Sequence, residues 1–193
     1  YFSSSGATSG KALSDAKREG KLMKAGRMDI AIHSLIQGIF HSHNFREDTK
    51  FHLFLYGMPD PPKHVEIQPN EDLTLSKKDV GDLLKKVLYK FKEGQKTEVL
   101  PGCTVEKKSI VKEVEEMAEN GQKIFLLDKK GEDLREVEIP PNSVFIFGDH
   151  EGLPKKEAKR LKKSATPLSV GPKMYFASQT VAIVHNELDR RGF

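Results

Sequence analysis

Two glycine-containing turns, each directly after an apolar segment, are the part of this sequence best suited to bind a ligand. Residues 143–147 (SVFIF) lead into the turn at residues 148–152 (GDHEG), and residues 166–170 lead into Gly171 and Pro172. In an open α/β sheet ligands gather at the carboxyl ends of strands, and glycine lets the backbone approach a ligand closely. A plain strand-to-helix turn with two glycines explains the first segment equally well.

The second turn is followed by Lys173 and then by Met174, Tyr175 and Phe176. Two glycine-bearing strand ends beside one lysine-rich helix would form a cleft lined with backbone amides and apolar side chains. Such a lining suits an uncharged purine ring and a sulfonium group better than a triphosphate, because a phosphate cradle needs several amides at one helix N-terminus. The alternative is that the three large side chains are core residues, which is the commoner role of apolar clusters.

Arg27 and Asp29 stand at the start of a predicted helix and could take part in binding or catalysis. An aspartate near a helix N-terminus is favourable for the helix dipole, which is a sufficient structural explanation for Asp29. Arg27 could pair with that carboxylate or face a ligand.

Basic side chains form two zones on a chain whose formal net charge is +4. Contacts of such groups with phosphates give salt-dependent affinity that is blind to sequence, so both zones are candidates for nucleic-acid contact. Charge runs are more often solvated faces, which is the alternative. The zones comprise Lys11, Lys17, Arg18, Lys21, Lys24 and Arg27, and residues 154–163 with five lysines and Arg160.

Several other kinds of site are excluded by their missing motifs. There is no GxGxxG, P-loop, HExxH or GxSxG motif. Seven histidines are present, including His41 and His43, but their spacing does not resemble a metal site, so no metal is expected. The single Cys103 excludes an internal disulfide and a multi-cysteine zinc site, and it fits a reducing cytoplasm.

The elements that must position these residues alternate between helices and strands. With 193 residues, the chain suits one domain, and no apolar run approaches the roughly 18 residues of a membrane span. The chain begins with Tyr1 rather than Met, as expected for a piece of a longer protein. Apolar spacing predicts helices over residues 28–40, 79–91, 109–120, 154–163 and 176–188, and strands over residues 51–56, 64–67, 123–127, 143–147 and 166–170.

This alternation favours an α/β fold with a parallel sheet covered by helices on both faces. Residues 128–131 are predicted to form a turn, and residues 16–24 a polar, basic connection that Gly26 ends. Residues 93–108 are the best candidate for a variable surface insertion.

Six segments in this order resemble the archaeal tRNA pseudouridine-54 N1-methyltransferase (TrmY) family of the SPOUT class. No single segment is unique to that family, but six in register are specific, and the resemblance covers nearly the whole chain. Residues 27–33 (RMDIAIH) also resemble the related ribosomal-RNA pseudouridine N1-methyltransferases. The six segments are AGRMDI at residues 25–30, LYGMPDPP at 55–62, KGEDL at 130–134, VFIFGDH at 144–150, LSVGP at 168–172 and HNELD at 185–189.

The resemblance implies a single SPOUT methyltransferase domain over residues 1–193, with a C-terminal trefoil knot at about residues 123–193 that binds S-adenosylmethionine. It also implies a cytoplasmic homodimer built on the knot helices and tRNA as the partner, with no membrane and no metal. The cofactor would be held largely by backbone groups. The residues that the resemblance assigns to it are Leu127, Gly148, Val170, Gly171, Pro172, Lys173, Met174, Tyr175 and Thr180.

The chain departs from the family pattern at two places. Thr180 stands where many members carry cysteine, and residues 15–24 are longer and more basic than the usual loop. The implied reaction is transfer of a methyl group from a sulfonium to N1 of pseudouridine. Asp29 would take the N1 proton or orient the base, and Arg27 would bind a uracil carbonyl or an adjacent phosphate.

Two other functions remain open at this point. One is methylation of pseudouridine in ribosomal RNA, and the other is a non-catalytic RNA-binding module of ribosome assembly that retains the fold. A metabolic enzyme with a small anionic substrate would explain the basic charge but not the six ordered segments.

Overall fold

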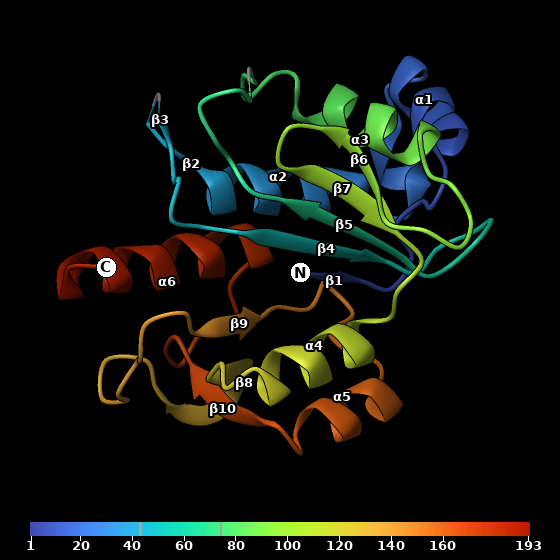
Figure 1. Ribbon diagram of the computed structural model, residues 1–193. Helices are drawn as coiled ribbons and strands as arrows, with labels where there is room; N and C mark the ends of the chain where they lie inside the picture. The colour runs from blue at the N-terminus through green and yellow to red at the C-terminus, as the bar shows by residue number, and fades with distance from the viewer. Residues whose placement is uncertain (43, 74) are drawn as a thin grey trace.

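The two-residue strand β1 (Phe2–Ser3) brings two sheets together in the computed structural model, which describes residues 1–42, 44–73 and 75–193 (Figure 1). On one side β1 pairs in parallel with β4 (Phe51–Leu55). On the other side the Phe2 amide donates a hydrogen bond of 2.9 Å to the carbonyl of Phe147, directly after β9 (Val144–Ile146). His43, one of the two neighbouring histidines in the sequence, lies outside the described residues.

The N-terminal sheet has the order β1-β4-β5-β7-β6, with β5 at Lys63–Ile67, β6 at Thr97–Leu100 and β7 at Cys103–Glu106. Only the β1–β4 pair in it is parallel, and the β4–β5, β5–β7 and β6–β7 pairs are antiparallel. The expectation of a parallel sheet throughout is therefore wrong for this half, and the fold is a mixed α/β one. Residues 93–108 are also not a surface insertion, because they supply β6 and β7.

The second sheet is entirely parallel, in the order β10-β8-β9, with β8 at Ile124–Asp133 and β10 at Ala165–Ser169. Leu126 of β8 pairs with Ile146 on one side and Pro167 on the other. The register then shifts, so that Leu168 pairs with Glu132. The predicted turn at residues 128–131 is thus an irregularity within a longer strand.

Helices pack against strands of both sheets. α1 and α3 contact each other, α2 contacts β4, α3 contacts β6 and β7, and α4 contacts β8 and α5. The sequence predicted five of these helices to within a few residues, but it missed α1 and the 3-10 helix η1 in the basic connection. A short antiparallel pair, β2 (Phe40–His41) and β3 (Asn44–Phe45), follows α2. The helices are α1 (Gly10–Arg18), η1 (Leu22–Ala25), α2 (Met28–Ile39), α3 (Val80–Tyr89), α4 (Ile110–Glu119), α5 (Lys155–Leu161) and α6 (Ala177–Arg191).

The last helix, α6, is fixed to both halves of the molecule by polar contacts. Arg191 donates 2.7 Å hydrogen bonds to the carbonyls of Leu134 and Val137. Arg46 makes a two-pronged 2.7 Å pair with Asp189 on the same helix. These contacts fix the C-terminal end of α6, the helix that follows the second glycine turn. No helix among the described residues is long and apolar enough to cross a membrane.

The interior of the N-terminal sheet holds unusual polar groups. The rings of His52 on β4 and His64 on β5 are stacked 5.1 Å apart, and burial lowers the pKa of both imidazoles to about 3, so both are neutral. The thiol of Cys103 on β7 is fully buried, and burial raises its pKa to about 11, with a smaller contribution from Glu98.

Gly26 is the point where η1 passes into α2 with no room for a side chain. Its φ is +71°, and a Cβ there would lie 1.6 Å from the carbonyl oxygen of Ser5. Gly20, by contrast, has φ +64° and no atom within 4 Å of such a Cβ. At both positions a residue other than glycine would be strained by the left-handed backbone conformation. Only at Gly26 would its Cβ also clash with backbone atoms.

We expect Gly26→Ala to lower the free energy of unfolding by more than about 3 kcal/mol, because strain and overpacking add. The matched control Gly20→Ala should cost only about 1–2 kcal/mol, which is the strain alone. Urea unfolding followed by circular dichroism measures both values. Equal losses for the two variants would show that Ser5 does not pack against Gly26 as described.

Candidate functional site

The carboxyl ends of three parallel strands meet at one edge of the second sheet. Because Leu126, Ile146 and Pro167 are level, the segments that follow β8, β9 and β10 all leave from this edge. Leu127, which the resemblance assigned to a cofactor, lies within β8 next to this level, and Gly148 lies in the segment after β9. The third contains Val170 and the residues after it. Residues more than 40 positions apart in the sequence are thus brought together by the parallel pairing alone.

The segment after β9 folds back on itself. A Cβ on Gly148 would lie 2.9 Å from the Cα of Gly152, and Asp149 forms an isolated bridge with Gly152. The carboxylate of Asp149 accepts 2.7 Å hydrogen bonds from both the amide and the hydroxyl of Ser4. Glycine at 148 is therefore required by a close backbone contact, and Ser4 anchors the turn.

The segment after β10 leaves its large apolar side chains uncovered. Gly171 has φ +131° and open space around it, since the nearest atom to a Cβ there would be the Tyr175 hydroxyl at 4.0 Å. Met174 is 82% exposed, Phe176 73% and Tyr175 39%. The alternative that these three are core residues is wrong. Pro172 and Lys173 are exposed as well.

Thr180 lies in the first turn of α6, close after this segment. Its hydroxyl donates a 3.1 Å hydrogen bond to the carbonyl of Phe176. The Thr180 side chain is half-buried, and its hydroxyl bonds within the first turn of α6 rather than to either glycine turn. At the edge itself, Asp128 accepts a 2.9 Å bond from Lys162 of α5, and this bond holds the pKa of the Asp128 carboxyl below its usual range.

Arg27 and Asp29 form a two-pronged pair. The guanidinium donates from Nε and Nη2 to the two carboxylate oxygens, at 3.0 Å each. Arg27 has φ +57° and precedes α2, while Asp29 lies in the first turn of that helix. The hydrogen bond from Arg27 is the main cause that lowers the pKa of Asp29, so this carboxylate is ionised at neutral pH and is a weak base.

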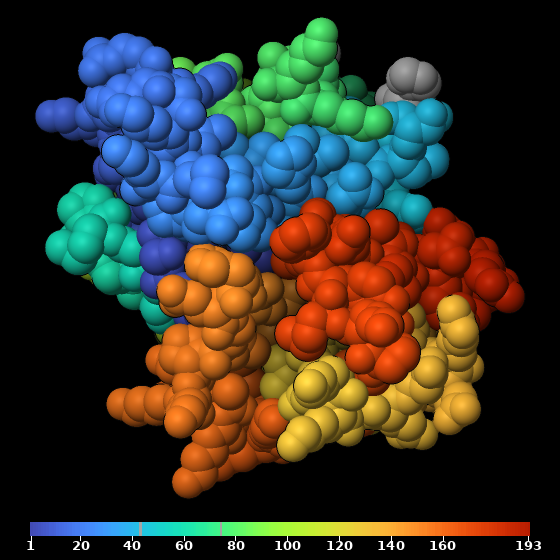
Figure 2. Space-filling model, turned by 180° about the vertical axis from the view of Figure 1, so that it is seen from behind, coloured from blue at the N-terminus to red at the C-terminus, as the bar shows by residue number. Residues whose placement is uncertain are grey.

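This pair lies near the turn after β9. Tyr1 lies between the two. Burial, and then the charges of Asp149 and Asp29, raise the pKa of its phenol, while the charge of Arg27 lowers this pKa, so all three charged groups lie near it. The phenol oxygen of Tyr1 is buried with no hydrogen-bond partner among the described residues. Figure 2 shows the N-terminal segments directly above the orange region that follows β9.

The segments that carry the two basic zones both lie on the side of the molecule shown in Figure 2. The first lies on α1 and η1 and the second on α5, and the turn at residues 148–152 runs into α5. Most of their cationic side chains are exposed, although Lys17 pairs with Asp82 and Arg160 with Glu115. A flexible anion such as a polynucleotide could therefore span both zones beside the strand ends.

A cavity of about 760 Å³ lies away from this edge. Its lining runs from Arg46 and His52 to residues 139–147 and α6, and it includes none of the residues that the sequence assigned to the cofactor or to catalysis. Sequence reasoning also missed Ser4 and Tyr1. Ser4 bonds Asp149, 145 positions away, and the amino group of Tyr1 bonds the carbonyl of His52, 51 positions away, so no local pattern signals either contact.

Comparison with known proteins adds independent information. The family model described as "Putative SAM-dependent RNA methyltransferase" matches residues 6–193. A "Putative pseudouridine methyltransferase" of Vibrio parahaemolyticus is 37% identical over 172 residues, covering 86% of each chain. The "tRNA (pseudouridine(54)-N(1))-methyltransferase" of Pyrococcus abyssi is 33% identical and covers 87% of each chain, and that of Methanococcoides burtonii is 32% identical and covers 86% of this chain and 84% of its own.

Among solved structures, the crystal structure of Archaeoglobus fulgidus Nep1 bound to S-adenosylhomocysteine superposes with a TM-score of 0.60. The match covers 98% of this chain and 95% of that one at 15% identity. At this identity the likeness concerns the fold, and it supports the mixed α/β arrangement of helices and strands described above.

The Arg27–Asp29 pair generates a pH prediction. The folded-state pKa of Asp29 is lowered, so its contribution to stability is present above the unfolded pKa, about 3.9, and is lost as the pH falls through the lower folded value. We expect Asp29→Asn to lower Tm by no more than about 4 °C at pH 7, because the pair is partly exposed. The difference from wild type should shrink towards pH 3.

Thermal unfolding followed by circular dichroism between pH 7 and pH 3 measures this difference. Asp15→Asn, in an exposed pair with Arg18, is the control and should leave Tm unchanged. A Tm difference for Asp29→Asn that stayed constant across the range would mean that the ion pair does not form.

Proposed function

The chain belongs to the family of SAM-dependent RNA methyltransferases, and we propose that it methylates N1 of pseudouridine 54 in tRNA. The observation that carries this proposal is the agreement of two archaeal relatives that bear this activity in their names, each covering more than four fifths of the chain. The exposed basic zones on one face supply the sequence-blind phosphate contacts that a folded RNA requires.

The residues at the strand ends fit S-adenosylmethionine chemically. The space beside Gly171 is open, and the uncovered side chains of Met174 and Tyr175 offer an apolar surface for a purine ring. When bound, this cofactor supplies an activated methyl group on a positively charged sulfur. We assign its binding to Leu127, Gly148, Val170, Gly171, Pro172, Lys173, Met174, Tyr175 and Thr180.

Arg27 and Asp29 act on the RNA side in this proposal. The pair uses Nε and Nη2 of the guanidinium, which leaves Nη1 to donate to a uracil carbonyl or a phosphate. The pKa of Asp29 is lowered and its carboxylate is paired with Arg27. Asp29 is therefore better suited to orient Arg27 than to remove the N1 proton. Because methyl transfer is an in-line displacement, holding the base in this orientation supplies much of the acceleration.

The proposal includes four further features. Residues 1–193 form one SPOUT methyltransferase domain, and residues from about 123 onward are threaded as a trefoil knot. Two copies associate through the knot helices, an arrangement that would cover the exposed side chains of Met174 and Phe176. An enzyme acting on tRNA would work in the cytoplasm.

Methylation of ribosomal RNA is the competing specificity. Purified protein is to be incubated with cofactor and two pseudouridine-containing transcripts, one a tRNA and one a ribosomal-RNA hairpin, and the products analysed by mass spectrometry of nucleosides. Methylated pseudouridine in the tRNA alone supports the proposal. Methylated product in the hairpin alone would mean that ribosomal RNA, not tRNA, is the substrate. Absence of product from both transcripts would favour a protein that binds RNA without methylating it.

We expect Gly148→Val to raise the Kd for S-adenosylhomocysteine by at least about 100-fold. The new side chain would collide with Gly152 and displace the turn. Gly81→Val is the control, because a Cβ on Gly81 makes only an ordinary 3.5 Å contact with Ile32. Isothermal titration calorimetry on folded protein measures both. Wild-type affinity in Gly148→Val would move the cofactor away from this edge.

We expect Arg27→Ala to retain cofactor affinity within about threefold and to lose at least about 100-fold in kcat/KM for tRNA. The reason is that it removes an RNA-facing donor without touching the strand ends. Arg18→Ala, on the exposed end of α1, should reduce kcat/KM by less than about tenfold through salt-dependent affinity only. Unchanged turnover of Arg27→Ala at saturating tRNA would exclude a role for this residue in positioning the base.

A further inference from the structure

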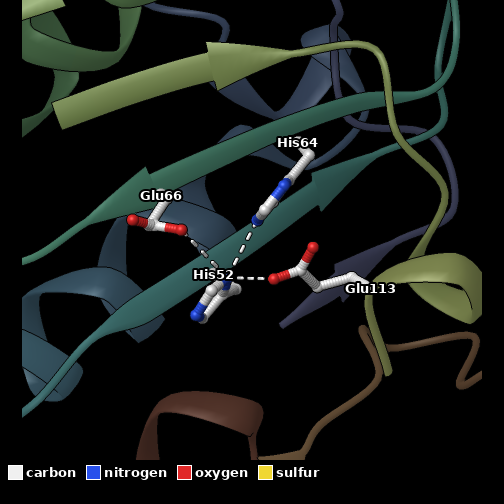
Figure 3. Close-up of side chains that lie close together, drawn as sticks. All are labelled: His52, His64, Glu66 and Glu113. Atoms are coloured by element: carbon white, nitrogen blue, oxygen red, sulfur yellow. Dashed lines mark hydrogen bonds and ion pairs between the residues drawn. The ribbon is translucent and has the colours of Figure 1, made fainter. Parts of the chain in front are cut away.

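Four side chains that no part of the methylation proposal uses converge from two strands and a helix (Figure 3). His52 lies on β4, His64 and Glu66 on β5, and Glu113 on α4. Each offers one nitrogen or oxygen atom, and these four atoms all lie within 4.8 Å of one another. A tetrahedral zinc with bonds of about 2.0–2.1 Å places its ligand atoms about 3.3 Å apart, so a small contraction would suffice.

The antiparallel pairing explains why three of these side chains meet. His52 is directly opposite Glu66 in the β4–β5 register, and His64 is two residues from Glu66 on the same face of β5. Glu113 comes from the helix that packs on the other sheet. All four side chains are at most 15% exposed. The cluster is therefore held by the fold itself rather than by mobile surface groups.

The two histidines are oriented as metal ligands. Nδ1 of His64 lies 3.0 Å from Oε1 of Glu106, so it carries the proton and leaves Nε2 unprotonated. That Nε2 accepts a 2.9 Å hydrogen bond from Nδ1 of His52, whose proton a bound zinc ion would displace. A carboxylate that fixes the tautomer of a ligating histidine is the usual second partner in zinc sites. Imidazole nitrogens also favour zinc over magnesium or calcium.

The carboxylates face the same point. Oε1 of Glu113 is 3.7 Å and Oε2 of Glu66 is 3.9 Å from Nδ1 of His52. Lys108 holds the other oxygen of Glu113, and Lys96 is 3.1 Å from Oε2 of Glu66. Glu113 therefore offers an oxygen that no lysine contacts among the described residues. Glu66 offers an oxygen with a second lone pair.

An ion can reach the cluster from outside. His52, Glu66 and Glu113 line the cavity of about 760 Å³ that lies away from the cofactor edge. A hydrated cation could enter there and exchange its water molecules for the four side chains. His64, which is 1% exposed, would be the innermost ligand.

We propose that His52, His64, Glu66 and Glu113 form a Zn²⁺ site that ties α4 to the β4–β5 pair. Spacing along the chain does not signal such a site, because Glu113 is far from the other three in sequence. The proposal replaces the expectation, drawn from spacing alone, that the protein binds no metal. It is independent of the RNA substrate and of the methyl donor.

The test uses the full chain without an affinity tag, stripped with a chelator and dialysed. Zinc is titrated in competition with a chromophoric chelator, and cobalt is titrated separately, because tetrahedral cobalt with nitrogen and oxygen ligands absorbs in the visible range. We expect one zinc per chain and a cobalt spectrum of tetrahedral type. Zinc should also raise Tm.

Variants locate the ion. Glu113→Gln and His52→Ala should each weaken zinc affinity by at least about tenfold and remove the rise in Tm, and Glu106→Gln should weaken it about 10- to 100-fold by releasing the tautomer of His64. The controls are Glu119→Gln, on the exposed end of α4, and His33→Ala, exposed on α2. Both should bind zinc as the wild type does.

Circular dichroism of each stripped variant confirms that it is folded. Glu113→Gln keeps the side-chain volume at a position that is not fully buried, so this variant should fold. It therefore tests the proposal even if His52→Ala is unstable. Absence of zinc binding by the folded wild type would overturn the proposal. Binding that Glu113→Gln and His52→Ala leave unchanged would overturn it too, because the ion would then lie elsewhere.

Discussion

The backbone pairing of β1 is the constraint on which the rest of the structure depends. This strand has only two residues, yet it hydrogen-bonds to β4 on one side and to the end of β9 on the other. It thereby joins an antiparallel region, which carries Arg27 and the first basic zone, to the parallel region, which carries the glycine turns. Ser4, the next residue along, binds Asp149 in the turn after β9. One short segment therefore fixes the distance between the RNA side and the cofactor side of the proposed site.

The sequence predicted the elements with strong apolar periodicity and missed those shaped by partners elsewhere. Helix α2 and strands β4 and β9 could be recognised because their apolar residues follow a helical or strand spacing. Helix α1 was hidden in a basic stretch, since only Gly10 and Leu13 of its residues are buried, too few to give a clear period. β6 and β7 were taken for an insertion because Gly94, Gly102 and many charged residues obscure their alternation.

Parts of the candidate site could likewise be predicted from local sequence, and other parts could not. The glycine turns were visible because local backbone chemistry demands glycine there, and the parallel pairing brings them to one edge. The pairing of Arg27 with Asp29 was one of two alternatives that the sequence left open, and the structure shows this ion pair. The anchoring of Asp149 by Ser4 and the histidine–glutamate cluster could not be foreseen, because both unite residues whose proximity only the completed fold creates.

The burial of Cys103 has a practical consequence. The protein has one thiol, it lies on the inner strand β7 with no exposed surface, and its pKa of about 11 leaves little thiolate at neutral pH. A soluble alkylating reagent can reach this sulfur only when β7 separates from its neighbours. The rate of its modification therefore reports, without any engineered label, how often the antiparallel half of the molecule opens while the rest stays folded.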